Sequence, residues 1–216
     1  SLESSLTQNR PDPLRHSEAA GLVNRSAFTP RIHHAGVQFS SPELLIIEQQ
    51  GELRFWQLNV QFTVKTIFRR DRAQIDYQTN ITPHGKHFRL RAALPSTVGS
   101  KGKVNYEVAF GIQQRSRGTH CAQNCLDLSD DAKGLAVLNR GLPANAADDD
   151  GNLMLELFRS AAMEYKGPSS GAFADNVTHR FEYAVLPHAA PDLGEVIKAG
   201  ILLNLPLCET DTVPTY

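Results

Sequence analysis

The sequence predicts a mainly β chain folded as an antiparallel sandwich of two stacked sheets. Two observations lead to this prediction. Apolar and polar residues alternate along several stretches, of which 58–64 is the clearest, as in strands with one buried face. Apart from residues 193–199, no long stretch keeps apolar residues at the spacing of a helix. Alternating strands bury one face most simply by packing it against a second sheet.

Length and charge narrow the classes of function. The chain has 216 residues, enough for one large domain or two small ones with a substantial core. Its 22 Lys and Arg nearly balance its 23 Asp and Glu, and no basic block is present. This balance argues against partners such as nucleic acid or a membrane surface. Apolar runs are far too short to span a bilayer. Three cysteines, an odd number, argue against a disulfide framework and favour a cytoplasmic location.

The first 30 residues differ in character from the rest. They are polar and contain Pro11, Pro13 and Pro30, with one short helix predicted at 17–22. We interpret residues 1–30 as an arm or connector from an upstream region. The β-sandwich domain is predicted to span residues 31–216.

Strands follow one another along this domain. Leu58 to Val64 alternates, and so does 73–81, where the polar partners are Arg72, Gln74, Asp76, Gln78 and Asn80. The segment 82–86 reads as a hairpin turn into the next strand, 88–94, so these two strands are predicted to pair antiparallel. Further strands are predicted at 104–110, 135–138, 153–158, 181–186 and 201–205.

The strand at 135–138 ends in a polar pair. Four apolar residues are bounded by Gly134 and by Asn139-Arg140-Gly141, which fits a strand covered on both faces. Arg140 offers five donors in a rigid fork and Asn139 offers both a donor and an acceptor, so the pair is equipped to hold sugar hydroxyls or a carboxylate. The alternative is that these residues form only a turn.

Other candidate sites are weaker. Cys121 and Cys125 near His120 lack the second ligand pair that structural zinc normally has. The segment 148–151 lacks the spacing of a calcium loop and reads as a hairpin turn. His179 and Glu182 could be the acid and base of a sugar epimerase, but strand alternation places them on opposite faces. No complete catalytic constellation and no metal site is predicted in this chain.

Seven ordered blocks lie between about Arg70 and Pro206. They are Asp71–Tyr77, Phe88–Ser96, Tyr106–Gly111 with Arg115, Leu126–Asp130, Gly134–Leu142, Leu157–Ser160 and His179–His188. Together these blocks resemble the C-terminal β-domain of glycoside hydrolase family 38, the retaining α-mannosidases, and particularly its bacterial members. Three departures stand out: Leu94 where Phe is commoner, Ala109 in place of Pro, and Cys125-Leu126 where an aromatic residue often precedes the Asp-Leu-Ser segment.

The resemblance implies a fold and a parent enzyme. The fold would be a large β-sandwich of the galactose-mutarotase-like type. The parent would hydrolyse α-mannosides with retention, and its N-terminal catalytic domain would hold zinc and the nucleophilic Asp. No residue here matches the family's zinc or nucleophile motifs, so both are expected outside this chain. The expected partner is the catalytic domain of the same polypeptide, and association into a homo-oligomer is left open.

Within that enzyme, Asn139, Arg140 and Arg159 are the candidate substrate-binding residues. Arg159 is included because an Arg that closes a buried apolar strand needs an acceptor; its alternative is an ion pair inside this domain. Two other functions stay open for the chain as a whole: an independent carbohydrate-binding or mutarotase-like module, and a purely structural linker.

Overall fold

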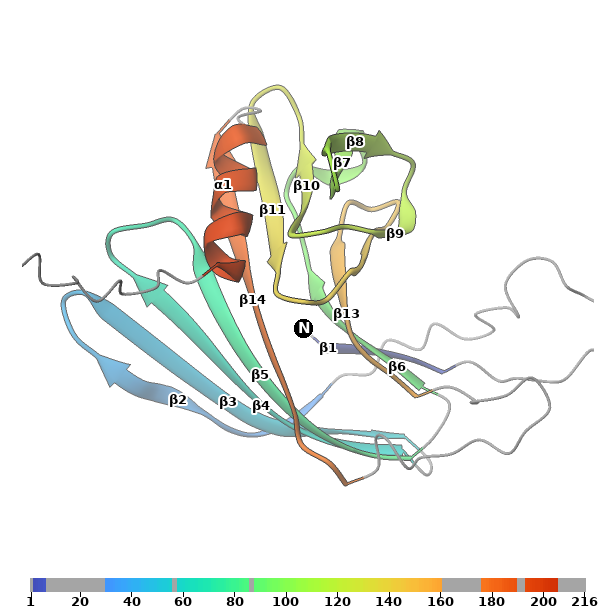
Figure 1. The fold of residues 1–216 in the computed structure, drawn as a ribbon. Coiled ribbons are helices and arrows are strands. Elements are labelled where there is room, and N and C mark those ends of the chain that lie inside the picture. The colour runs from blue at the N-terminus through green and yellow to red at the C-terminus, as the bar shows by residue number, and fades with distance from the viewer. Residues whose placement is uncertain are drawn as a thin grey trace, which may run out of the picture.

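The computed structural model describes residues 2–6, 30–55, 58–85, 88–160, 176–189 and 193–205. Within these residues the strands form two antiparallel sheets, which confirms the predicted fold class (Figure 1). The larger sheet has the order β2-β3-β4-β5-β14-β11-β10-β7-β8. In that order its strands are Arg31–Ser40, Leu44–Phe55, Leu58–Arg69, Ile75–His84, His179–Ala189, Lys133–Asn139, Cys125–Ser129, Lys103–Val108 and Gly111–Arg115.

The smaller sheet has the order β1-β6-β13-β12-β9. In that order its strands are Leu2–Leu6, Phe88–Leu94, Leu153–Ser160, Ala144–Ala147 and Gly118–Cys121. Strand β1 comes from the predicted arm and pairs with β6, whereas the helix predicted at 17–22 lies outside the described residues. A short 3-10 helix, Gly99–Lys101, and one α-helix, α1 (Leu193–Asn204), complete the elements of the described residues.

The main core lies between the two sheets. The predicted alternation of β4 is confirmed, because Leu58, Val60 and Phe62 are buried while their neighbours are less so. From the smaller sheet, Leu90 and Leu155 are completely buried against them. Aliphatic and aromatic side chains from both sheets thus form one apolar layer, as expected for a sandwich.

Strand β11 is covered on both faces, as its apolar run predicted. Val137 contributes to the core between the sheets, whereas Ala136 and Leu138 belong to a second cluster that includes Val196 of α1. The helix lies against β11 and β10 on the side away from the smaller sheet (Figure 1), and Ala184 of β14 belongs to the same cluster. The position of β11 in the middle of three layers explains why its sequence is apolar without alternation.

The strand predicted at 201–205 is wrong, since residues 193–204 are helical. The apolar residues at 193–199 have, weakly, the spacing of a helix, and the structure follows this spacing and not that of a strand. Val196, Ala199 and Leu203 fall three or four residues apart and pack together on the sheet. A short apolar run such as Ile201 to Leu203 fits a strand or a helix equally well until its packing partner is known.

The predicted hairpin between residues 73–81 and 88–94 is also wrong. Strand β5 pairs with β4 and β14 in the larger sheet, while β6 pairs with β1 and β13 in the smaller one. Both strands turn an apolar face to the core, so the chain crosses from one sheet to the other instead of folding back. Alternation reveals which face of a strand is buried but not which strand lies beside it.

Two turns of the structure bear on the predicted strands. The strand predicted at 104–110 ends at Val108, and Phe110 lies fully exposed in the following turn. Gly111, the first residue of β8, has a φ of 148°. The hairpin turn predicted at 148–151 is confirmed. The backbone N–H of Asp148 donates to the carbonyl of Asn152 at 3.0 Å, and the turn joins β12 to β13.

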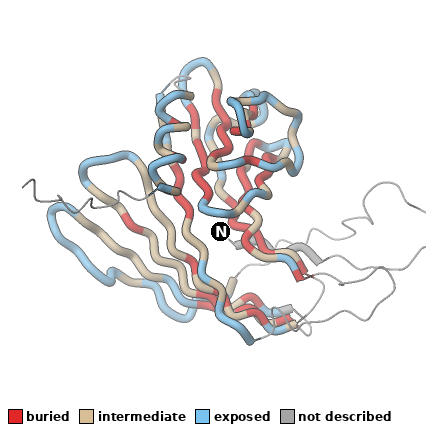
Figure 2. Tube along the Cα trace, in the orientation of Figure 1, coloured by how far each residue is buried: buried red, intermediate tan, exposed pale blue. Residues whose placement is uncertain are grey.

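Burial is uneven across the larger sheet. Strands β10 and β11 are largely buried, whereas β2 is exposed along nearly its whole length (Figure 2). Strands β2 to β5 extend past the elements that cover the rest of this sheet (Figure 1). In the described part of the chain, no helix has the length and apolar character needed to cross a membrane.

Candidate functional site

Charged side chains gather where β11 ends beside β14. Arg140, the first residue after β11, forms an ion pair with Glu182 of β14, and Arg180 pairs with the same carboxylate. Burial would raise the pKa of the Glu182 carboxyl, but the hydrogen bonds and charges of Arg180 and Arg140 hold it below its usual value of 4.5. Glu182 therefore stays ionised at neutral pH and bridges two guanidinium groups.

Asn139 lies on the opposite face of the sheet from this ion pair. It sits across from Tyr183, whereas Leu138 sits across from Ala184 on the side of α1. Its backbone is held firmly: its N–H donates to the Asn124 carbonyl and its carbonyl accepts from Asn204 Nδ2, both at 2.8 Å. Its side chain is completely buried, and neither amide atom has a partner. An unsatisfied buried amide costs roughly 1–3 kcal/mol, so a polar group that reached it would bind well.

Arg159 lies apart from the other two candidates. It belongs to β13 of the smaller sheet, across from Arg89 of β6. Its side chain is exposed, so water can satisfy its donors, and the argument that it must find a buried acceptor fails. The structure brings Arg140 beside Glu182. The Asn139 side chain lies on the core side of the same sheet, and Arg159 lies in the other sheet.

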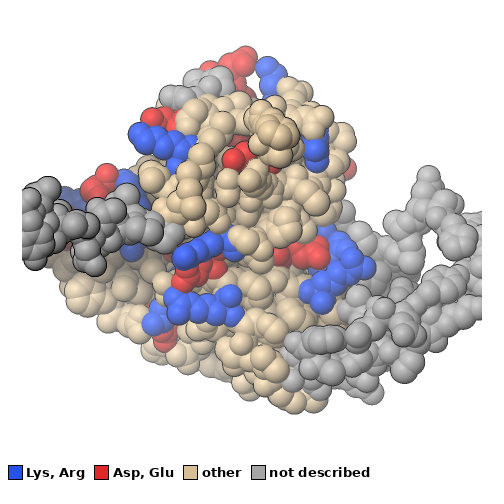
Figure 3. All heavy atoms as spheres, viewed as in Figure 1, with Lys and Arg blue, Asp and Glu red and all other residues tan. Residues whose placement is uncertain are grey.

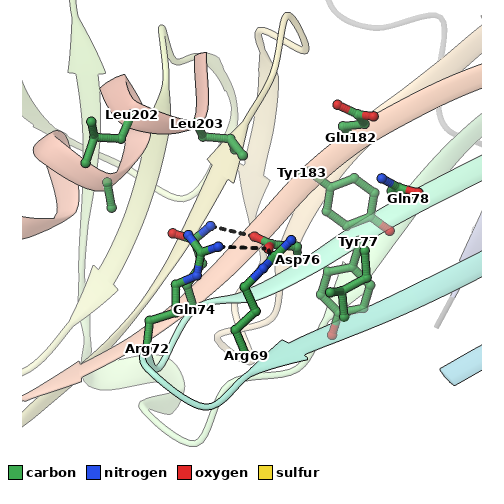
Figure 4. A pocket seen from close by; sticks show the side chains of 12 residues that line it. Arg69, Arg72, Gln74, Asp76, Tyr77, Gln78, Glu182, Tyr183, Leu202 and Leu203 are labelled. Carbon is green, nitrogen blue, oxygen red and sulfur yellow. Dashed lines mark hydrogen bonds and ion pairs between the residues drawn. The ribbon is translucent and has the colours of Figure 1, made fainter. Parts of the chain in front are cut away.

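A hollow of about 400 Å³ adjoins Glu182 beneath the C-terminal half of α1 (Figure 4). Residues paired across strands share a face, so Asp76, opposite Ala184, and Gln78, opposite Glu182, lie on the side of the sheet that α1 covers. The hollow is lined by Ile67, Arg69, Arg72, Gln74, Asp76, Tyr77, Gln78, Glu182, Tyr183, Ala199, Leu202 and Leu203.

Asp76 is the centre of the polar wall of this hollow. Arg69 forms an ion pair with it, Arg72 Nη2 lies 4.0 Å from its Oδ2, and Gln74 Nε2 donates to its Oδ1 at 2.5 Å (Figure 4). Sequence reasoning assigned Arg72, Gln74 and Asp76 only to the polar face of a strand. It did not show that the turn between β4 and β5 brings Arg69 to the same face of the sheet as these residues.

Elsewhere on the surface, charges of both signs are mixed. The view in Figure 3 shows small clusters of Lys and Arg beside Asp and Glu and no extended patch of one sign. A separate cluster in the smaller sheet is largely buried: Arg89 and Arg91 form ion pairs with Glu156, at 3.1 and 3.7 Å. Removing one partner there would leave a largely buried charge without its ion pair, which is costly.

The remaining candidate residues lie apart from Glu182 or from one another. His179 packs on Phe158 with ring centroids 4.9 Å apart, on the core side and away from Glu182, as the alternation predicted. Cys121 is exposed and Cys125 is buried. Burial, together with the nearby Glu107 and Asp127 carboxylates, raises the pKa of the Cys125 thiol. Among the described residues, no group of three or more His, Cys, Asp or Glu side chains is arranged to hold a metal ion.

Comparison with known proteins shows which family the chain resembles. Residues 38–166 match the family described as "Glycosyl hydrolases family 38 C-terminal domain". Human alpha-mannosidase 2C1 is 33% identical over 145 residues, which cover 62% of this chain and 13% of that protein. Its mouse counterpart is 32% identical over the same lengths. The chain thus spans only a small part of these relatives.

Solved structures agree on the fold. A glycosyl hydrolase family 38 protein from Enterococcus faecalis superposes with a TM-score of 0.71 at 14% identity, over 84% of this chain and 25% of that one. An alpha-mannosidase from Enterococcus faecalis V583 gives a TM-score of 0.68 at 15% identity, over 83% of this chain and 24% of that one. On the match over 38–166, this chain belongs to glycosyl hydrolase family 38, whose C-terminal domain it carries.

Proposed function

We propose that this chain is the C-terminal β-domain of a retaining, zinc-dependent α-mannosidase that hydrolyses α-mannosides. One observation carries the proposal: residues 38–166 match the family's C-terminal domain, and 62% of the chain aligns with a protein named alpha-mannosidase. Hydrolysis with retention requires two carboxyl groups about 5–5.5 Å apart and a covalent glycosyl-enzyme intermediate. The family resemblance assigns these groups to the catalytic domain of the same polypeptide.

Zinc belongs to the same proposal. The described residues offer no set of three donors for it, so they do not fit a zinc site, and no step of the reaction is assigned to a metal on this chain. A metal in the parent enzyme would be held by the catalytic domain.

The role proposed for this domain is to support that catalytic domain and to line part of its active site. Arg140 is the residue best suited to this role, because it is exposed at the end of a strand that is fixed between two layers. The backbone carbonyl beside it is anchored to Asn204. A guanidinium held on such a rigid element can hold a sugar hydroxyl or a carboxylate of the catalytic domain at a constant position.

Replacing Arg140 by Ala in the full-length enzyme tests this role. Hydrogen bonds to a charged group contribute about 1.5–3 kcal/mol, so we expect kcat/KM for an aryl α-mannoside to fall roughly ten-fold or more. Arg54→Ala is the matched control, since Arg54 is exposed near the end of β3 and, among the described residues, forms an ion pair with Glu52 at 3.4 Å. Unchanged turnover in Arg140→Ala removes Arg140 from the active site.

A further inference from the structure

The side chain of Phe110 is completely exposed. Its exposed fraction of 102% is the largest among the large apolar side chains of the described residues. Phe110 lies in the two-residue turn between β7 and β8, where Val108 pairs with Gly111. Gly, Asn and Asp are the usual residues of such turns, because they adopt the required backbone conformation. The ring adds nothing to the core of this domain, so the stability of the domain does not explain an aromatic residue here.

The turn that carries Phe110 is fixed to the rest of the sheet. In β7, Tyr106 is completely buried, and the Glu107 carbonyl accepts from the N–H of Gln123 at 2.9 Å. The Glu107 carboxylate accepts from the N–H and from Nδ2 of Asn124, at 3.2 and 3.0 Å. An aromatic side chain on a rigid turn loses little conformational entropy when a partner covers it, which suits an interface anchor.

Phe110 lies at the same end of the larger sheet as Arg140. Between them runs segment 122–124, whose backbone bonds to Glu107 of β7 at 2.9 Å and to Asn139 of β11 at 2.8 Å. Only β10 separates β7 from β11, so these two strands are roughly 10 Å apart (Figure 1). An apolar ring with polar and charged neighbours is the composition of a protein interface. The exposed residues of this end, here named the sheet-end surface, are Ala109, Phe110, Gln123 and Arg140.

The small size of this surface favours a partner on the same polypeptide. Separate proteins that associate stably bury about 1,200–2,000 Å² in total, of which one Phe supplies only about 150–250 Å². Domains joined by the chain need less contact, because the tether gives them a high effective concentration. Residues 38–166, which include Phe110, match the family's C-terminal domain, and the relatives extend far beyond the part that this chain covers.

We propose that the sheet-end surface docks the catalytic domain of the same polypeptide, with the Phe110 ring inserted into an apolar pocket of that domain. The contact also brings Arg140 next to the catalytic domain, where the role proposed for it requires it. This inference rests on the proposed function, since that function supplies the catalytic domain.

Thiol labelling of the full polypeptide tests the contact. Ala109→Cys places a thiol beside Phe110 without removing the ring, and Gln123→Cys places one on the neighbouring segment in a second variant. We expect N-ethylmaleimide to label each position at least ten-fold more slowly in the native protein than in urea, because the catalytic domain covers both. Mass spectrometry of the digested protein assigns the label to each position and distinguishes it from the native cysteines.

Asp149→Cys is the matched control for access of the reagent. Position 149 is exposed in the turn between β12 and β13. This turn lies near the start of β7 and away from Phe110, because the Arg117 guanidinium donates to the carbonyls of both Asp148 and Gly102. The thiol at position 149 should label nearly as fast in the native protein as in urea.

Removing the ring tests whether Phe110 is the anchor. Phe110→Ala, combined with Ala109→Cys, should raise the rate of labelling in the native protein at least ten-fold. Phe110→Leu keeps an apolar side chain and should raise it less. Hydrogen exchange of the β10 amides should be unchanged in both variants, because Phe110 takes no part in the core of this domain.

Rapid labelling of both positions 109 and 123 in the native protein overturns the proposal. Protection that Phe110→Ala leaves unchanged, or that position 149 shares, overturns it as well. Hydrolysis of an aryl α-mannoside by the same samples reports on the proposed function separately. An enzyme that hydrolyses the mannoside but labels rapidly at positions 109 and 123 contradicts this inference alone.

Discussion

At the scale of single residues, Gly134 shows how closely two strands of this sheet approach. The ring of its cross-strand neighbour His188 lies directly over it, and His188 Nε2 meets Asp127 Oδ1 at 2.8 Å. Asp127 is almost completely buried and also accepts from Ser129 Oγ at 2.6 Å and from Asn105 Nδ2 at 3.2 Å. A side chain at position 134 would occupy the space of the His188 ring.

Gly134→Ala should therefore destabilise the domain by about 1–3 kcal/mol. An added Cβ would lie 2.3 Å from two ring atoms of His188 and 2.9 Å from Ser129 Cβ, so the ring must turn away from Asp127. Urea unfolding measures the loss. At Gly36, the control, the nearest atom to an added Cβ is 3.4 Å away, so Gly36→Ala should change stability by less than about 0.5 kcal/mol. Equal stability of the two variants would contradict this account.

A double mutant sharpens the same test. If the clash with the His188 ring is the cause, Gly134→Ala should cost markedly less in a His188→Ala background than in the unaltered protein. An unchanged cost would assign the effect to Ser129 or to the backbone instead.

At the scale of elements, an apolar seam and a polar anchor hold α1 on the larger sheet. The seam joins Val196 to Ala136 and Leu138 of β11 and to Ala184 of β14. The anchor is Asn204, which donates to the Asn139 carbonyl at the end of β11. Because the same helix forms one wall of the hollow, its docking sets the distance between Leu203 and the arginines of the opposite wall.

Leu138→Ala should loosen this helix. Leu138 is completely buried, and truncating a buried Leu to Ala costs about 2–5 kcal/mol. Leu205→Ala, just beyond the end of α1, should cost under about 0.5 kcal/mol, because Leu205 is 66% exposed. Hydrogen exchange of the α1 amides should rise in Leu138→Ala and stay unchanged in Leu205→Ala; equal protection in both would mean that this seam does not hold the helix.

At the scale of the whole molecule, the chain presents surface that its own described elements leave uncovered. Strand β2 exposes Ile32, Val37 and Phe39, and Phe110 is fully exposed at the far side of the same sheet. The proposed function includes a catalytic domain in the same polypeptide. On the proposed function, the carboxylates that cleave the glycosidic bond are on that catalytic domain.

The isolated 216-residue chain should accordingly not hydrolyse an aryl α-mannoside, whereas the full-length enzyme should. Titration of the isolated chain with mannose and galactose separates the alternatives, because an independent mutarotase-like module would accelerate interconversion of the anomers. Cleavage of the mannoside by the isolated chain would contradict the assignment of catalysis to the other domain.

The sequence by itself determined the class of fold, the faces of individual strands and the family. These properties depend on local patterns: the period of two in β4, the unbroken apolar run of β11, the Asp-Gly turn at 150–151, and the ordered blocks around them. It also predicted that Arg140 follows a doubly covered strand and that His179 and Glu182 face opposite ways.

Only the tertiary structure decided which elements meet. In the structure, β6 lies in a different sheet from β5, and residues 201–204 are helical. Arg159 lies in the smaller sheet, apart from Arg140 at the end of β11. The tertiary structure also assembled the hollow from the hairpin of β4 and β5 together with β14 and α1, which lie far from that hairpin in the chain. The reason is that a strand or a helix has one apolar face whatever its neighbour, while the choice of neighbour depends on contacts between residues far apart in sequence.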